Sequence, residues 1–333
     1  MKFSIVVPMK EITDYFREAI PYFERQNFKD FELIILPNGG GKNEFKNLKN
    51  VKVINTGAVS PGIKRNIGVK NSKGEIIAFI DDDAYPEKDW LEKANENFKD
   101  KNIVAVGGPS LVPHNATFFQ RISNKVYELS SGKTGIRYGE HKKIEEIDDW
   151  PACNLFVRRK DFNEVGGFNT KYFGGEDTQV CYSLLKTSKR MIYNPKLIIY
   201  HHPRKSLSNH IKQTLFWAMW RGFFMRIYPK NSIRLTFFMP ALFILGLFLG
   251  GILSLIYKPI SYLYFGILGF YFLFLIFIGL RTKSVKLFFP VIFVTAITHL
   301  MYGIGFFIGL FAGKYGPTRS GMHPKENLKT NRK

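Results

Sequence analysis

The sequence is poor in cysteine and in acidic residues. Its two cysteines, Cys153 and Cys181, provide neither a disulfide framework nor the ligand spacing of a zinc site. Asp and Glu number 27 against 48 Lys and Arg, so the formal net charge is +21. Such an excess favours contact with anionic lipid headgroups and attracts phosphorylated substrates. No recognisable nucleic-acid module accompanies it, so we expect no nucleic-acid partner.

Charged residues are absent from three long apolar stretches, at about 235–257, 260–280 and 287–313. About 20 apolar residues suffice to cross a bilayer, so residues 231–313 are predicted to form a membrane region with three spans. Residues 1–205 are expected to form a soluble domain without a signal peptide. We therefore expect a multi-pass protein of the cell membrane with a cytoplasmic soluble domain.

The side of the membrane on which the chain ends stays open. Basic residues precede the first span and separate the second from the third, which places both groups inside by the positive-inside rule. Three full spans would then put the tail of residues 314–333 outside, although that tail is also basic. Either the tail is an exception, or the third segment is a re-entrant pair of half-helices broken near residues 299–305.

Residues 207–228, within a linking region 206–230, are predicted to form an amphipathic helix in which aromatic and basic residues alternate. Tryptophan and tyrosine beside basic side chains favour the headgroup region, so we expect this helix in the cytoplasmic membrane interface. The alternative is an ordinary helix that packs its aromatic side chains on the soluble domain. The aromatic and basic residues are Lys212, Phe216, Trp217, Trp220, Arg221, Phe223, Phe224, Arg226 and Tyr228.

The soluble part alternates apolar strand patterns with helix patterns, which specifies an α/β fold with a mainly parallel central sheet. Residues 131–140, rich in Gly, Lys and Arg, are predicted to be a surface loop. The expected strands are 3–7, 31–36, 51–54, 75–80, 103–106, 150–157, 191–193 and 197–200, and the expected helices are 12–26, 61–69, 89–98, 118–130, 159–165 and 177–187.

The acidic cluster Asp81, Asp82 and Asp83 directly follows the apolar strand 76–80. A buried parallel strand that ends in carboxylates delivers oxygen ligands to the edge where α/β proteins bind ligands. Mg²⁺ and Mn²⁺ prefer such oxygens, so the cluster predicts a metal and phosphate site. A helix cap or a solvated turn is the alternative for the cluster taken alone.

Two further features are candidates for chemistry. Glu176 and Asp177 follow two glycines at a predicted helix start, where the helix dipole favours an ionised carboxylate that can accept a proton. A plain helix cap has the same pattern. His201 and His202 follow the strand 197–200, where a histidine is structural unless an acidic group is placed beside it.

In this order the motifs resemble the family 2 inverting glycosyltransferases, whose catalytic domain has the nucleotide-sugar-binding GT-A fold. The resemblance covers the whole soluble domain and depends on the ordered set of motifs. The matching segments are Phe-Ser-Ile-Val-Val-Pro at 3–8, Lys-Arg-Asn-Ile-Gly at 64–68, Ala-Phe-Ile-Asp-Asp-Asp at 78–83, residues 156–159 with 164–168, the Glu-Asp pair at 176–177, and 193–201.

The resemblance implies a role for each site residue. Asp81 would contact the nucleotide ribose or the metal, while Asp83 and His201 would complete the ligands of Mn²⁺ or Mg²⁺. Asp177 would be the general base, and Glu176 would position the acceptor or the base. The residues implied in nucleotide-sugar binding are Pro8, Glu11, Asn38, Arg65 and Asp81. In place of the family's usual Asp-Asp after the second strand, this chain has Pro37 and Asn38, so the preferred nucleotide stays open.

The expected function is a membrane-anchored, metal-dependent inverting glycosyltransferase. The nucleotide-sugar donor would give its sugar to a lipid-linked acceptor, either a polyprenyl phosphate or a lipid-linked glycan, in cell-envelope polysaccharide or glycoprotein glycan assembly. The sequence leaves the oligomeric state open. One alternative is a processive polysaccharide synthase, whose acceptor-contacting motif is similar to Gln213, Trp217, Trp220 and Arg221 of this chain. The others are a non-catalytic nucleotide-sugar-binding membrane scaffold and a nucleotidyltransferase.

Overall fold

The computed structural model describes residues 1–41, 44–45, 48–139, 141–314 and 316–317. The chain forms two compact units, an α/β unit of residues 1–113 and 139–202 and a helical unit of 114–138 and 203–317. The second boundary lies close to the expected one at 205. Residues 114–138 differ from expectation, because they group with the helical unit although they lie within the segment assigned to the soluble domain. The basic tail from 318 onward lies outside the described residues.

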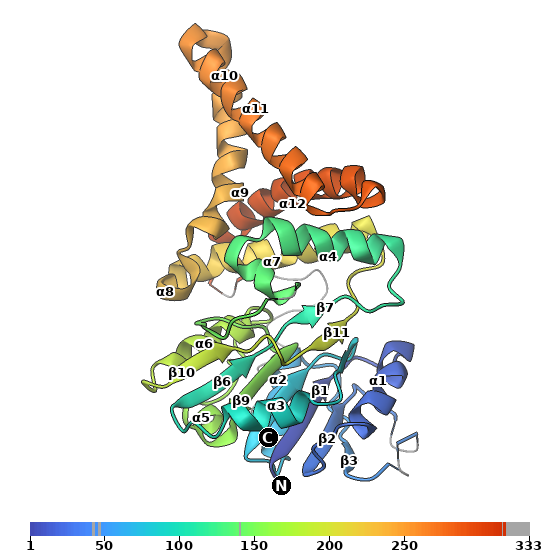
Figure 1. The fold of residues 1–333 in the computed structure, drawn as a ribbon. Coiled ribbons are helices and arrows are strands. Elements are labelled where there is room, and N and C mark those ends of the chain that lie inside the picture. Colours follow the sequence, from blue (N-terminus) through green and yellow to red (C-terminus); the bar gives the residue numbers. More distant parts are fainter. Residues whose placement is uncertain (42–43, 46–47, 140, 315, 318–333) are drawn as a thin grey trace. The chain divides into compact units, whose positions relative to one another are not determined.

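The α/β unit is built on an eight-stranded sheet in the order β3-β2-β1-β4-β9-β6-β10-β8 (Figure 1). Strands β8 and β9 run antiparallel to their neighbours, whereas the other six are parallel. The expected mainly parallel α/β fold is therefore confirmed. The strands are β1 (Phe3–Pro8), β2 (Phe31–Leu36), β3 (Val51–Val53), β4 (Ile76–Ile80), β6 (Ile103–Gly107), β8 (Glu145–Glu146), β9 (Asn154–Arg158) and β10 (Arg190–Tyr193).

The central strands are hydrophobic throughout because they are covered on both faces. Every residue of β1, β4 and β6 is buried, as expected for parallel strands between helices. Thr13 and Ser60 cap the first two helices through side-chain oxygens, and Pro61 occupies the first turn of the second. The helices of this unit are α1 (Asp14–Glu24), α2 (Pro61–Lys70), α3 (Trp90–Asn97), α5 (Arg159–Glu164) and α6 (Glu176–Leu185).

A second, three-stranded sheet consists of β5 (Ala84–Pro86), β7 (Ser110–Leu111) and β11 (Ile199–His201). Strand β5 pairs antiparallel with β11 so that Ala84 lies opposite His201. The acidic cluster occupies the short connection between β4 and β5. This pairing therefore brings the cluster beside a histidine that is more than a hundred residues away in the sequence.

The helical unit contains three stretches that are long and apolar enough to cross a membrane, Leu235–Ile256, Lys258–Arg281 and Val285–Leu310. The last is one unbroken helix, so the expected alternative of two half-helices broken near residues 299–305 is wrong. A 3₁₀ helix, Gly132–Arg137, occupies most of the expected loop 131–140. The α-helices are α4 (Phe118–Ser130), α7 (Leu207–Ile227), α8 (Pro229–Ser232), α9 (Leu235–Leu245), α10 (Gly251–Ile256), α11 (Lys258–Arg281) and α12 (Val285–Leu310), with a π-helical turn at Gly246–Gly250.

Helix α7 corresponds to the segment 207–228, which was expected to lie in the membrane interface with its aromatic side chains near the lipid headgroups. Its aromatic residues are instead largely internal to the helical unit, since Trp220, Phe223 and Phe224 are buried. Trp217 is the exception, with 38% of its surface exposed. Burial occurs because α7 packs closely on α12, whose glycines admit its backbone.

Candidate active site

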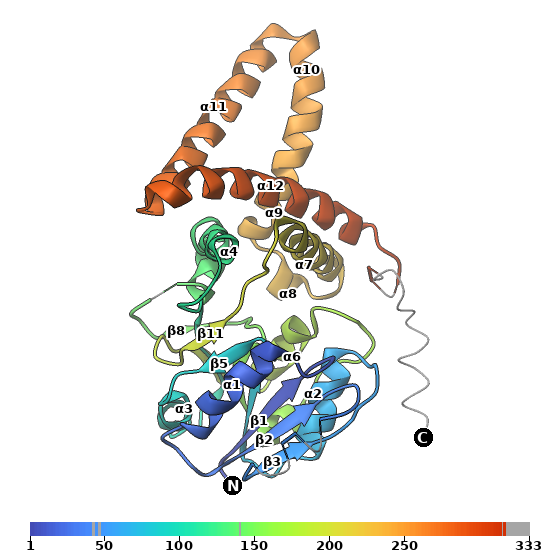
Figure 2. The same ribbon diagram turned by 90° about the vertical axis from the view of Figure 1, so that its right-hand side faces the viewer.

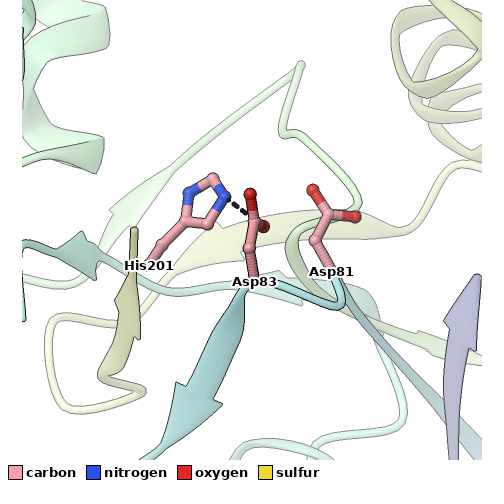
Figure 3. A group of neighbouring side chains, drawn as sticks. All are labelled: Asp81, Asp83 and His201. Carbon is pink, nitrogen blue, oxygen red and sulfur yellow. Dashed lines mark hydrogen bonds and ion pairs between the residues drawn. The ribbon is translucent and has the colours of Figure 1, made fainter. Parts of the chain in front are cut away.

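Asp81, Asp83 and His201 form a cluster whose potential ligand atoms all lie within 4.8 Å of one another (Figure 3). Nε2 of His201 lies 2.8 Å from Oδ1 of Asp83. The side chains of Asp81, Asp83 and His201 are 31%, 17% and 22% exposed, so a ligand can reach them. Two carboxylates and one imidazole are a donor set that fits a divalent cation. The structure thus brings together the three residues implied as metal ligands.

The adjacent histidines have different surroundings. The N–H of His202 donates to the carbonyl of Asp83 at 2.9 Å, and its ring stacks on Tyr15 with centroids 4.0 Å apart. Its Nε2 lies 3.1 Å from Glu18 Oε2. His202 is therefore a buried structural residue that fixes the backbone of the acidic cluster, whereas His201 belongs to the site.

Arg65 joins this cluster to the second acidic pair. Its guanidinium lies 2.9 Å from Asp81 Oδ1 and 3.2 Å from Glu176 Oε1, with a longer approach of 3.8 Å to Asp177 Oδ1. The guanidinium also lies over the ring of Phe168, 5.5 Å from its centroid. The Arg65 side chain is only 7% exposed. A single buried cation therefore holds three carboxylates that come from two distant parts of the sequence.

The local backbone presents Glu176 and Asp177 at the first turn of α6. Gly175 precedes the helix with a φ of +69°, a left-handed conformation that favours glycine. Gly62 of α2 lies beside Glu176, since a Cβ built on it would lie 3.4 Å from Cγ of Glu176, which is an ordinary van der Waals distance.

Burial makes these carboxyl groups easier to protonate. Desolvation, followed by repulsion from Asp177, raises the pKa of Glu176 to about 7 although the charge of Arg65 opposes the shift. Desolvation also raises the pKa of Asp177, again against the effect of Arg65. This direction is opposite to the one expected from the helix dipole. The cause is that Oδ1 of Asp177 is buried and has no hydrogen-bond partner among the described residues.

Crowding affects the acidic cluster as well. Desolvation, then repulsion from Asp83 and Asp81, raises the pKa of Asp82 to about 7. Three neighbouring carboxyl groups repel one another, which favours either protonation or a bound cation in addition to the ion pair of Asp81 with Arg65. The electrostatics therefore agree with the cation site indicated by the ligand geometry.

Asn38, one of the residues implied in nucleotide binding, is held by a lysine that the sequence reasoning did not single out. The Lys64 ammonium lies 2.7 Å from Asn38 Oδ1, 2.8 Å from Thr56 Oγ1, 2.8 Å from the carbonyl of Met9 and 3.2 Å from that of Leu36. Desolvation lowers the pKa of Lys64 to about 8, so the ammonium is still charged at neutral pH. The sequence could have identified Lys64 as a site residue, because it lies beside Arg65 in the motif 64–68.

The other implied residues are placed as follows. Pro8 ends β1 and Glu11 is exposed just beyond it, at the same edge of the sheet as Asn38. Trp217, Trp220 and Arg221, the expected acceptor or interface residues, belong to α7 of the helical unit. Trp220 is 3% exposed, and the Arg221 guanidinium lies 4.6 Å from the centroid of Phe237. Of the three, only Trp217 presents a substantial aromatic surface.

Comparison with known proteins gives a consistent result. The model of "Glycosyl transferase family 2" matches residues 4–166. Glucosyl-dolichyl phosphate glucuronosyltransferase of Haloferax volcanii is 28% identical over 258 residues, which cover 70% of this chain and 80% of the relative. A Methanococcus voltae enzyme, dolichyl N-acetyl-alpha-D-glucosaminyl phosphate 3-beta-D-2,3-diacetamido-2,3-dideoxy-beta-D-glucuronosyltransferase, is 22% identical over 275 residues, covering 76% of this chain and 83% of the relative.

Among solved structures, the crystal structure of S. aureus TarS 1–349 in complex with UDP has a TM-score of 0.47 and 18% sequence identity. The alignment covers 66% of this chain and 64% of that chain. The family match includes the acidic cluster and Arg65 but ends before Glu176, Asp177 and His201. The family match and the mainly parallel sheet together agree with the GT-A fold that the motifs implied.

Proposed function

Because the chain belongs to glycosyl transferase family 2, we propose that it transfers a sugar, with inversion, from a nucleotide-sugar donor to a lipid-linked acceptor. The observation that carries the proposal is the arrangement around Arg65. This one guanidinium contacts Asp81, one of the three residues that could hold a cation, and both carboxylates of the Glu176–Asp177 pair. In this proposal, the donor site and the proton acceptor would lie side by side, as a single displacement requires.

On the donor side, Asp81, Asp83 and His201 would hold Mn²⁺ or Mg²⁺. A bound cation supplies charge neutralisation for the leaving diphosphate. Pro8, Glu11, Asn38 and Arg65 are the proposed nucleotide-sugar contacts. They gather at the carboxyl edge of β1, β2 and β4, where the strand order changes direction and open α/β sheets bind ligands.

On the acceptor side, Asp177 would act as the general base. Its side chain is 28% exposed although Oδ1 is buried, so part of the carboxylate can meet an acceptor hydroxyl. Burial raises its pKa and thus its proton affinity. The hydroxyl proton passes to Asp177 while the new bond forms at the anomeric carbon and the bond to the diphosphate breaks. Glu176 positions the base through their shared partner, Arg65.

Two observations support a lipid-linked acceptor, one from the relatives and one from the helical unit. The two relatives described above are named for dolichyl phosphates that already carry a sugar, and this chain has three helices apolar enough to enter a membrane. A sugar hydroxyl needs a general base, whereas a polyprenyl phosphate is already anionic. The acidic pair therefore favours a lipid-linked glycan as the acceptor. The α/β unit would work on the cytoplasmic face, in cell-envelope polysaccharide or glycoprotein glycan assembly.

The proposal is tested with two variants of the full-length protein and a panel of UDP, GDP, CDP and dTDP sugars. Asp177→Asn should lower transfer to a lipid-linked sugar by about 10² to 10⁴ while leaving nucleoside diphosphate binding intact. Asp83→Ala should abolish the Mn²⁺-dependent part of that binding in calorimetry. Asp30→Asn, at an exposed position outside the site, is the matched control.

Two results would contradict the proposal. The first is near-normal transfer by Asp177→Asn to a sugar hydroxyl, and the second is unchanged Mn²⁺-dependent binding by Asp83→Ala. The product lengths in the same assay distinguish the processive synthase, because a single added sugar per acceptor excludes polymer formation. A membrane scaffold or a nucleotidyltransferase would give no glycosylated lipid at all.

A further inference from the structure

Helix α12 lies lengthwise along α7. His210 of α7 contacts Thr298 of α12, and further along Ala218 and Leu215 meet Gly305. Near the helix ends, Arg226 donates to the carbonyl of Ala312. The contacting residues of α12 rise in sequence number as those of α7 do, so the two helices run side by side in the same direction. With a rise of 1.5 Å per residue, the contact extends over about 20 Å.

Close backbone approach locks this packing. A side chain at Gly309 would overlap the carbonyl of Met219, and one at Gly222 of α7 would overlap the carbonyl of Phe306. Small residues at matching positions let two helix backbones touch, which is a stable arrangement within or beside a lipid phase. The pair α7–α12 therefore behaves as one rigid element.

A buried polar chain fixes the same pair to α4. Burial lowers the pKa of His210 to about 4, so its imidazole is neutral. Thr298 donates its hydroxyl to the carbonyl of Val294, and so Nε2 of His210 donates to the Thr298 oxygen at 2.8 Å. Nδ1 then accepts from Ser123 of α4, also at 2.8 Å. Tyr127 of α4 stacks on the imidazole, with centroids 4.9 Å apart.

Helix α7 is unsuited to cross a bilayer. Lys212, Arg221 and Arg226 are distributed along it, and a charged side chain is unfavourable in the hydrocarbon core of a bilayer. Because α12 is locked alongside α7, the two helices share one orientation. By length and composition alone, α12 could span the membrane. However, α7 with its charged side chains would then also lie in the hydrocarbon core of the bilayer.

The other two apolar stretches are arranged differently. Figures 1 and 2 show α9 and α10 rising from the helical unit and α11 returning beside them, as a hairpin. In both views α12, drawn in red, runs across the base of this hairpin. The hairpin exposes large apolar side chains on all sides, among them Leu255, Phe265 and Phe270 at 88%, 66% and 75%. Such a surface requires lipid around it.

The charges mark the two ends of the hairpin. Lys258, the first residue of α11, is the single basic residue at the tip. At the base, Arg234 precedes α9. Arg281 ends α11, Lys283 lies in the connection, and Lys286 belongs to the first turn of α12. By the positive-inside rule the base faces the cytoplasm and the tip faces the outside.

We propose that only the α9–α11 hairpin crosses the bilayer, and that α12 lies with α7 and α4 in the cytoplasmic interface. The proposal rests on the membrane attachment contained in the proposed function. It gives α12 one partner, the lipid surface, which covers its outward side chains Phe289, Phe293, Ile308 and Phe311. Because α12 does not cross, the basic residues after it remain on the cytoplasmic side, where anionic lipids attract them.

The test is cysteine accessibility in intact cells that express the full chain. In a background of Cys153→Ala and Cys181→Ala, single cysteines are placed at the tip (Lys258→Cys), at the base (Ser284→Cys) and in the tail (Ser320→Cys). A membrane-impermeant maleimide should label the tip in intact cells, and it should label base and tail only after permeabilisation. Ser284→Cys is the control, because two and three crossings both place it inside.

Labelling of Ser320→Cys from outside would show a third crossing and overturn the proposal. Protection of Lys258→Cys in intact cells would overturn it as well, because the hairpin would then not cross. A fluorescent protein that matures only in the cytoplasm, fused after Lys333, gives a second reading that needs no substitution, and we expect it to fluoresce. Neither measurement depends on transferase activity, so a failure here is distinguishable from a failure of the proposed function.

Discussion

The guanidinium of Arg65 lies 3.8 Å from Oδ1 of Asp177, and the same guanidinium is paired with Asp81 at 2.9 Å. One end of this arrangement belongs to the cation cluster and the other to the proposed base. A change in charge at either end therefore alters the electrostatic environment of the carboxylates at the other end, because both ends contact the same buried side chain. Position 65 is the place where the two halves of the site can be uncoupled experimentally.

Arg65→Ala should destabilise the α/β unit by about 3 kcal/mol, because it leaves several partly buried carboxylates without their cation. Arg65→Lys keeps the charge but loses the planar fork that reaches Asp81 and Glu176 together, so transfer should fall by about 10²-fold. Thermal unfolding and initial rates of transfer measure the two effects. A lysine variant with wild-type rates would show that the fork geometry is irrelevant.

Glu176→Gln should change the pH dependence of stability. The folded-state pKa of Glu176 is raised to about 7 from 4.5, so the native state binds more protons than the unfolded state between these values. The stability of the wild type therefore falls as pH rises through this window, whereas the variant lacks this loss. The difference in melting temperature should be near zero below pH 4.5 and should favour the variant above pH 7.

Two comparisons complete the Glu176 experiment. Glu164→Gln, at an exposed position, should show no such pH-dependent difference from the wild type. If Glu176→Gln were less stable than the wild type at pH 8, the ion pair with Arg65 would outweigh desolvation, contrary to the prediction.

Lys64→Met should weaken the region around Asn38. The ammonium contacts four oxygen acceptors, and the substitution would leave the buried ones among them unsatisfied. We expect a loss of about 2–4 kcal/mol in stability and weaker nucleoside diphosphate binding. Lys70→Met, at the exposed end of the same helix, is the control. Equal melting temperatures for the two variants would refute this role of Lys64.

Gly309→Leu should separate α12 from α7, because a side chain there meets the backbone of Met219. Overpacking of this kind costs about 1–3 kcal/mol, and more where the obstacle is backbone. Gly266→Leu is a matched control, since a Cβ at Gly266 of α11 has nothing within 4 Å. Melting temperatures in detergent should therefore fall for the first variant only. A similar loss in both would mean that replacing a helix glycine by leucine is harmful in itself, and that the close packing against Met219 does not decide the result.

The sequence was sufficient for the long, regular elements. Runs such as 3–8 and 31–36 are recognisable because a buried parallel strand needs consecutive apolar residues, and α4 has the predicted bounds 118–130. Strands β5, β7 and β8 were not predicted, because two or three residues are too few to show a period. The domain assignment of α4 failed for another reason. Its apolar residues, such as Ile122 and Val126, pack with α11 and α12, and a local pattern does not identify the partner of a helix.

The site was predictable where motifs are local and less so where pairing is long-range. The cluster of Asp81, Asp83 and His201 is assembled as the family resemblance implied. The pairing of Arg65 with Glu176 was not visible, because it joins residues that are 111 positions apart in the sequence. The direction of the pKa shift at Asp177 was also missed, because the sequence shows the helix start but not the burial.

The grouping of α4 with the helical unit has a practical consequence for dissecting the protein. The chain passes between the units at residues 113–114, 138–139 and 202–203, so a protease cut near 205 would not release an intact α/β fragment. A recombinant fragment of residues 1–205 would keep α4 but remove α7, α11 and α12, and Ile122 and Val126 would become exposed. Replacement of residues 114–138 by a short polar linker should therefore be needed to obtain a soluble catalytic fragment.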